Sequence, residues 1–191
     1  MNDGYKDTQI GIVPNNWKIL QTQEIGKIVT GTTPSTKRPE YYGGHYPFIT
    51  PTDISDKKYI DNVERYLTEK GYNVSRPLPP KSVVVTCIAS IGKNAITTVE
   101  SCTNQQINSI ICNNQNNPEY IYYILSYKKQ QLKALSGKTS VPIVNKGEFS
   151  TFLIPIPPLP EQKKITTILS TVDESIEKTT HIIDKTKRKK E

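Results

Sequence analysis

The chain has 191 residues with 35% hydrophobic residues and a net charge of +7, so it can form one globular domain with a modest core and one further element. Its three cysteines, Cys87, Cys102 and Cys112, form no Cys-x-x-Cys pair and are accompanied by only two histidines, which argues against a disulfide framework and a metal site. No signal-peptide stretch and no apolar run of roughly 20 residues is present, so we expect a cytoplasmic protein without a membrane partner.

The N-terminal third contains turns and aromatic residues. A lead-in segment ends at Trp17, which we expect to anchor the core. Residues 22–25 can form one helical turn that stops at Gly26. A loop rich in Gly, Thr and Pro follows at 31–35, and an aromatic stretch covers 41–49.

The middle of the chain is typical of β structure. Residues 82–88 are β-branched and apolar, and 95–99 and 107–112 are further strand candidates. A short helix at 68–73 is expected to begin with Thr68 as its N-cap. We therefore predict an α+β domain with a mixed or antiparallel sheet.

One longer helix is predicted inside the domain. Asn117 can cap it, Pro118 suits its first position, apolar residues recur at helical spacing, and Gly137 can end it. A strand at 152–154 then leads into a proline cluster. Because prolines lack an N–H donor, neither a helix nor a central strand should continue through it. We place the domain at 1–156, a proline hinge at 157–160, and a helix at 161–191.

The C-terminal helix carries an apolar seam, and we expect it to protrude and pair with a second helix as a coiled coil. The seam residues alternate by three and four positions: Ile165, Leu169, Val172, Ile176, Thr179 and Ile183. Polar residues such as Thr179 can set the register of such a pair. The alternative is a helix that folds back onto its own domain.

Four stretches together resemble the specificity subunits of type I restriction-modification systems, in the order found in that family. They are GIVPNNW at 11–17; GTTPS at 31–35 with YYGG at 41–44 and PFIT at 47–50; IGK at 91–93 with TNQQ at 103–106; and PPLPEQKKI at 157–165. The last stretch, which leads directly into the seam helix, is the most specific.

The resemblance implies a non-catalytic subunit that recognises DNA. Such subunits contain two target-recognition domains, each followed by a spacer helix, and the two helices pack antiparallel. Each domain reads half of a bipartite site, adenine methyltransferase subunits bind around them, and restriction subunits can join. This chain resembles half of such a subunit, which either dimerises (or pairs with another half-subunit) or is a fragment of a longer chain. The S-adenosylmethionine cofactor would belong to the methyltransferase, so we expect none here.

The sequence contains no motif that would predict catalysis. It has no P-loop and no methyltransferase or nuclease signature, and Asp53 and Asp56 fit a turn better than a metal pair. Cys87 lies within an apolar strand, which does not suit a nucleophile. We expect no catalytic residue. Two rival interpretations are the recognition end of a fused methyltransferase-nuclease, and an assembly protein that pairs through its helix without reading DNA.

Most of the positive charge lies in residues 1–159, with 17 Lys and Arg against 12 Asp and Glu, as suits a domain that meets phosphates. Asn and Gln at 104–106 can bond adenine in principle, but the resemblance marks this segment as a framework element. The candidate DNA contacts are Lys37, Arg38, Tyr41, Tyr42, Lys57, Lys58, Lys138 and Thr139, with Lys128 and Lys129 as further candidates.

Overall fold

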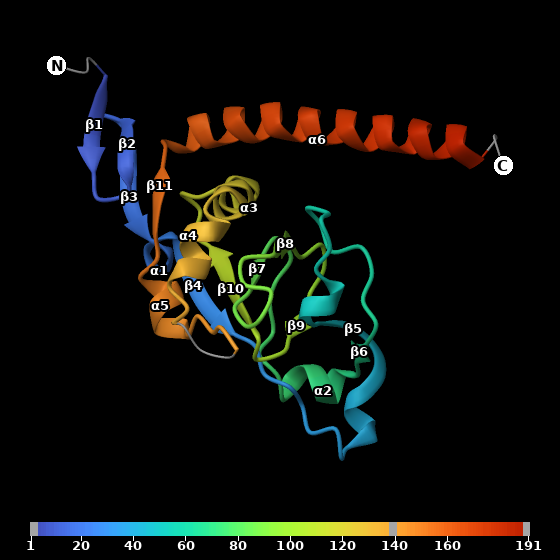
Figure 1. Ribbon diagram of the computed structural model, residues 1–191. Coiled ribbons are helices and arrows are strands. Elements are labelled where there is room, and N and C mark those ends of the chain that lie inside the picture. Colours follow the sequence, from blue (N-terminus) through green and yellow to red (C-terminus); the bar gives the residue numbers. More distant parts are fainter. Residues whose placement is uncertain (1–3, 138–140, 189–191) are drawn as a thin grey trace.

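A computed structural model describes residues 4–137 and 141–188 and consists of an α+β domain from which one long helix extends (Figure 1). The helical elements are α1 Thr22–Ile25, α2 Glu69–Asn73, α3 Pro118–Tyr127, α4 Lys129–Ala134, α5 Lys146–Ser150 and α6 Leu159–Arg188, with the 3-10 turns η1 Pro39–Tyr41 and η2 Pro51–Asp53. The strands are β1 Tyr5–Thr8, β2 Gly11–Pro14, β3 Lys18–Gln21, β4 Gly26–Thr30, β5 Tyr42–Ile49, β6 Tyr66–Leu67, β7 Val83–Thr86, β8 Asn94–Ile96, β9 Cys102–Thr103, β10 Ile107–Cys112 and β11 Leu153–Ile156.

The central sheet has four strands in the order β4-β10-β7-β8, and every neighbouring pair is antiparallel. The strands predicted near 82–88 and 107–112 are confirmed as β7 and β10, and the strand predicted at 95–99 forms as the shorter β8. Both faces of β7 are buried: Val83 and Val85 contact one apolar cluster and Val84 contacts another. This double burial explains the nearly continuous β-branched run, because a strand covered on both sides needs no polar face.

A second, smaller sheet joins β6, β5 and β9, in which β5 pairs antiparallel with β6 and parallel with β9. The domain therefore contains both pairing types, which is the mixed alternative of the predicted mixed or antiparallel sheet. Phe48, Leu67 and Cys102 bury the interior of this sheet, and Tyr42, Tyr46 and Tyr72 pack against them. The aromatic stretch of the sequence thus supplies the core of this second unit.

The predicted α2 and α1 are confirmed, whereas the helix predicted over 117–137 divides into α3 and α4. Thr68 caps α2 through a bond from the N–H of Gly71, and Asn117 caps α3 through a bond from the N–H of Glu119. The break lies at Lys128, whose backbone leaves the helical region at φ −90° and ψ 13°. The change of direction places Leu132 in the same core cluster as Leu125.

The start of α6 is attached to the domain. The helix begins at Leu159, two residues earlier than expected, because Pro160 fits the first turn, where no backbone N–H bond is needed. Antiparallel pairing of β11 with β3 brings the end of the domain to the entry segment. Trp17 is only half-buried, which corrects its prediction as a core anchor: it contacts Tyr120 edge-on and bonds Glu161 of α6.

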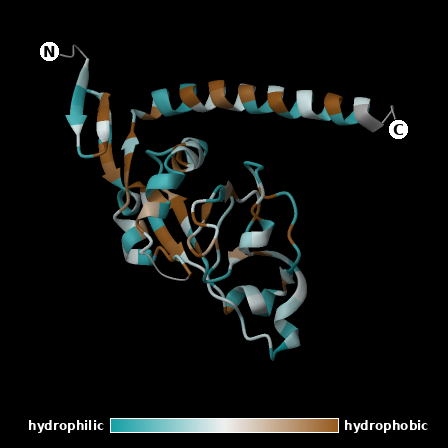
Figure 2. Ribbon diagram, viewed as in Figure 1, coloured by the Kyte–Doolittle hydropathy of each residue, from teal (hydrophilic) through white to brown (hydrophobic). Residues whose placement is uncertain are grey.

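Beyond its first turns, α6 projects past α3 with apolar residues still exposed on it (Figures 1 and 2). Gln162 and Thr166 are buried against the domain, whereas Val172, Ile176 and Ile183 keep 50%, 58% and 49% of their surface exposed. Within the described ranges, none of the helices is both long and apolar enough to cross a membrane.

Candidate nucleic-acid interface

Several loops meet at one end of the central sheet, where β4 and β7 end and β10 begins. The N–H of Gly31 bonds the carbonyl of Ile107 at 3.1 Å, and the N–H of Cys87 bonds the carbonyl of Gln106 at 2.9 Å. A Cβ on Gly31 would lie 2.2 Å from the carbonyl oxygen of Asn104, so only glycine permits this approach. The loops at 31–38, 87–93 and 104–106 therefore share one edge of the domain.

The turn at 104–106 uses two of its three amide side chains internally. Asn104 Oδ1 accepts from the backbone N–H of Gln106, and Asn104 Nδ2 donates to Gln106 Oε1, both at 3.0 Å. These bonds agree with the framework role expected for the segment. Gln105 is exposed and accepts a hydrogen bond from Thr33 Oγ1 at 2.6 Å, which joins two of the loops at this edge.

The loop before η1 presents positive charge next to a tyrosine. Lys37 and Arg38 are exposed, and the Arg38 guanidinium lies 5.7 Å from the centre of the Tyr41 ring and 3.3 Å from its hydroxyl. Arg38 also lies 3.9 Å from Glu40 in an exposed ion pair, an interaction worth little in water. Both cations thus remain accessible to phosphates.

Tyr42 has a structural role that the sequence did not reveal. Its hydroxyl donates to the carbonyl of Pro34 at 2.7 Å and its ring packs against Phe48 and Leu67. Burial raises the pKa of Tyr42, and the nearby charge of Arg65 opposes that shift. The residue holds the loop that carries Lys37 and Arg38.

The structure separates the two lysines that follow η2. Lys57 is exposed and forms an ion pair with Asp61, whereas only 14% of the Lys58 side chain is exposed. The Lys58 ammonium donates to Ser170 of α6 at 2.7 Å and lies 3.5 Å from Glu119 of α3. This arrangement corrects the prediction of a DNA contact for Lys58, because its charge is used between the domain and the helix.

The remaining candidates fall into two groups. Lys128 is buried, and burial lowers its pKa, so it presents no open charge to a ligand. Lys138 and Thr139 lie outside the described residues. The chain just after them runs beside the shared loop edge, because Ile143 bridges to Ile88 and the N–H of Ala89 bonds the carbonyl of Pro142 at 3.1 Å.

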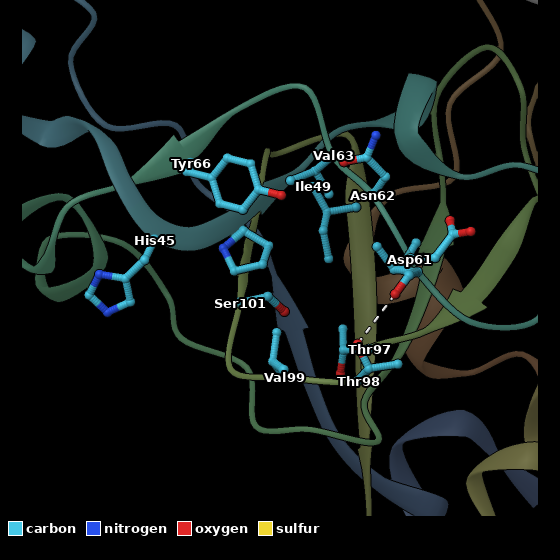
Figure 3. A pocket seen from close by; sticks show the side chains of 12 residues that line it. His45, Ile49, Asp61, Asn62, Val63, Tyr66, Thr97, Thr98, Val99 and Ser101 are labelled. Carbon is cyan, nitrogen blue, oxygen red and sulfur yellow. Dashed lines mark hydrogen bonds between the residues drawn. The ribbon is translucent and has the colours of Figure 1, made fainter.

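A hollow of about 280 Å³ lies beside β5, where the segment before β6 faces the loop at 97–101 (Figure 3). Ile49 and Val63 supply apolar walls, and Asn62, Thr98 and His45 supply polar ones. The hydroxyl of Ser101 lines it and is buried without a hydrogen-bond partner. Sequence reasoning missed this hollow, because its lining residues are dispersed between positions 45 and 101 without a shared motif.

The expected pairing residues differ in their surroundings. Ile165 packs against the core cluster of its own domain, and Leu169 is half-buried. Val172, Ile176, Thr179 and Ile183 are exposed, and the Thr179 hydroxyl bonds the carbonyl of Ser175. The helix thus packs on its own domain at its start and leaves the rest of the seam open.

Two features bear on chemistry in the described part of the chain. Burial raises the pKa of the Cys87 thiol to about 11, which disfavours the reactive thiolate. Within residues 4–137 and 141–188, no group of three or more His, Cys, Asp or Glu side chains is arranged to hold a metal ion.

Comparison with known proteins gives a consistent result. Residues 14–188 match the family model described as type I restriction modification DNA specificity domain. The chain is similar to the type I restriction enzyme MjaIX specificity subunit of Methanocaldococcus jannaschii, with 37% identity over 179 residues, 91% of this chain and 41% of that protein. It is also similar to the HindI specificity subunit of Haemophilus influenzae, with 35% identity, covering 86% of this chain and 38% of that protein. The chain spans about two fifths of the length of these relatives.

Solved structures show the same fold at lower sequence identity. A chain from a structure described as the basis of complex assembly and conformational transition of the type I R-M system gives a TM-score of 0.75 at 18% identity, covering 93% of this chain and 43% of that one. The HsdS subunit from Thermoanaerobacter tengcongensis gives 0.71 at 18% identity, covering 92% of this chain and 41% of that one. Both matches cover most of this chain and less than half of the other.

Proposed function

Because the chain belongs to the family of type I restriction modification DNA specificity domains, we propose that it is a DNA-recognition subunit of a type I restriction-modification system. In this proposal it binds double-stranded DNA at a specific sequence and carries out no chemistry itself. The observation that carries the proposal is the family match over residues 14–188, which covers the recognition domain from Pro14 onward and all of α6.

The partners follow from the same proposal. A separate adenine methyltransferase binds S-adenosylmethionine and modifies the DNA, and this chain directs it to one half of a bipartite site. Restriction subunits can join the same assembly. The relatives support this reading, because each is named as the specificity subunit of a type I restriction enzyme.

Pairing through α6 would bring two recognition domains together. The support is the apolar seam that its own domain leaves exposed at Val172, Ile176 and Ile183. An exposed apolar row of this kind favours packing against a second helix, because removing apolar surface from water stabilises the pair. The second helix comes from another copy of this chain or from another half-subunit.

The DNA contacts are proposed for the edge where the loops meet and for the adjoining loop before η1. Lys37 and Arg38 contact phosphates there, and Tyr41 supports Arg38 through its ring and hydroxyl. Gln105 and Thr33 are exposed at the same edge, and the hydrogen bond between them joins two of the loops there.

A selection experiment tests the function. The full chain, with and without its methyltransferase partner, is incubated with a pool of random duplexes, and the bound DNA is sequenced. We expect enrichment of one bipartite sequence, and methyl transfer from S-adenosylmethionine only when the methyltransferase is present. A pool that stays random in both arms contradicts DNA recognition, and methyl transfer by this chain alone contradicts the non-catalytic role.

A further inference from the structure

A cluster of polar side chains joins α6 to the domain beyond the first turns of the helix. This Lys58 cluster comprises Lys58, Tyr59, Glu119, Tyr123, Ser170 and Asp173. Its members come from the segment after η2, from α3 and from α6. The Lys58 ammonium donates to Ser170 Oγ at 2.7 Å and to the Tyr123 hydroxyl at 3.3 Å, and it lies 3.5 Å from Glu119 Oε2.

The acidic members of the cluster also have partners. Glu119 Oε1 accepts a bond from the Tyr59 hydroxyl at 2.7 Å, and Asp173 Oδ2 accepts one from the Tyr123 hydroxyl at 2.5 Å. Burial alone would raise the pKa of Glu119, but the bond from Tyr59 and the charge of Lys58 outweigh burial and lower it. The cluster is therefore a connected network in which each element bonds the other two.

A second attachment lies at the start of α6. The Gln162 amide accepts from the N–H of Asn117 at 2.8 Å and donates to the carbonyl of Pro157 at 2.9 Å. Ser170 follows Gln162 by eight residues, which is roughly 12 Å along a helix. Two attachments at this separation define the direction of a helix, whereas one attachment would leave it free to pivot.

Apolar packing does not fix this direction from Ser170 onward. Val172 and Ile176 are exposed, and a hollow of about 720 Å³ lies between the continuing helix and the segment around Asp61. The hollow gives α6 room to tilt. Hydrogen bonds depend on geometry more strongly than apolar contacts do, so a polar network is suited to hold one angle.

We propose that the Lys58 cluster sets the angle between α6 and the recognition domain, and through it the separation of the half-sites that two paired chains read. This proposal rests on the proposed function. From Gln162 to Arg188, α6 is roughly 39 Å long, so a tilt of roughly 10° moves its far end by about 7 Å. That displacement equals the rise of about two base pairs, at roughly 3.4 Å each. Lys58 is thus a positioning residue.

Distance measurement between two spin labels tests the angle directly. The full chain carries labels at Glu64→Cys in the domain and Lys178→Cys on α6, and dilution with unlabelled chain removes distances between paired molecules. The chain without these two substitutions reports any labelling of the native cysteines. Lys58→Met removes the central charge, and Lys57→Met is the matched control, because the neighbouring ammonium pairs with Asp61 at the surface.

We expect one narrow distance distribution for the wild type and for Lys57→Met. Lys58→Met should broaden it by several ångström, the displacement that a tilt of roughly 10° produces. Lys58→Arg keeps the charge and the donors and should restore the narrow distribution. Ser170→Ala with Asp173→Ala removes the acceptors on the helix side without leaving a buried cation alone, and should broaden it as well. A narrow distribution in Lys58→Met or in the double variant overturns the proposal.

Half-site separation provides the functional readout. The duplexes contain the selected bipartite sequence, and the separation of its half-sites increases by one base pair from one duplex to the next. Binding affinity is compared across this series. Wild type should prefer one separation by about tenfold, and Lys58→Met should accept neighbouring separations within about threefold. An unchanged preference in Lys58→Met overturns the proposal. A wild type that selects no sequence contradicts the proposed function instead, while the distance measurement still decides the role of the cluster.

Discussion

The indole Nε1 of Trp17 donates a hydrogen bond of 3.0 Å to Glu161 Oε1, and this bond joins the entry segment of the domain to the first turn of α6. Asn16 Nδ2 donates to the other carboxylate oxygen at 3.3 Å. Trp17 and Glu161 are 144 positions apart in the chain. The entry segment and the long helix therefore form one structural unit.

Trp17→Phe should destabilise the domain by about 1–2 kcal/mol, because it removes a donor to a charged acceptor while an aromatic ring remains against Tyr120. Urea denaturation followed by circular dichroism measures the change. Glu161→Gln is the matched control: it keeps an acceptor oxygen and should cost less. An identical urea midpoint for Trp17→Phe and wild type would show that the bond contributes nothing.

Gln162→Ala should be among the most costly polar substitutions in α6, at about 2–4 kcal/mol. The buried amide bonds the N–H of Asn117 and the carbonyls of Pro157 and Gln115, and its removal leaves these groups without their partner. Lys163→Ala, at the next and exposed position, should change the free energy of unfolding by less than about 0.5 kcal/mol. Equal effects of the two substitutions would contradict this role for Gln162.

Val172→Asp with Ile176→Asp should abolish pairing through α6, because burying two charges in an apolar seam costs several kcal/mol. Both positions are exposed within one chain, so the domain itself should remain folded. Sedimentation over a range of concentrations measures the association. Thr167→Asp with Lys178→Asp places acidic residues outside the seam and should leave pairing intact. The same oligomeric state in both double variants would exclude the seam as the interface.

Lys37→Gln with Arg38→Gln should weaken DNA binding to all sequences alike. If each cation contacts one phosphate, the slope of the logarithm of the association constant against the logarithm of salt concentration should become less negative by about 2. Lys27→Gln with Lys81→Gln removes the same charge at exposed positions that are not candidate DNA contacts, and serves as the control. An unchanged slope in the first variant would place the DNA on another face.

Stability should fall as the pH rises from about 9 to about 11, because burial raises the pKa of Cys87 and of Cys102 from 9.0 to about 11. Between these two pH values the folded chain holds protons that the unfolded chain releases. The contribution of the two thiols to stability is therefore complete below pH 9 and is lost as the pH rises to about 11. Urea midpoints across this range measure the effect, and Cys87→Ala should flatten the dependence of stability on pH.

At pH 8 a disulfide reagent should label Cys87 and Cys102 only after unfolding. Rapid labelling of these two thiols in the folded chain would contradict their burial.

Much of the architecture was contained in local patterns. The strand near 107–112 and the caps at Thr68 and Asn117 depend on neighbouring residues, whose β-branched side chains or side-chain oxygens act over a few positions. The apolar seam of α6 was readable for the same reason, since helical spacing is a local property.

Tertiary structure alone decided which charges are free and where the long helix points. Lys57 and Lys58 are adjacent and chemically identical, yet one remains at the surface and the other bonds Ser170, 112 residues away. Likewise, Trp17 was predicted to lie in the core and instead holds Glu161. In both cases the partner comes from a distant part of the chain, and only the packing of α3 and α6 brings it within hydrogen-bonding distance. Sequence patterns determined the elements and the family, whereas contacts between distant residues determined the geometry of the site.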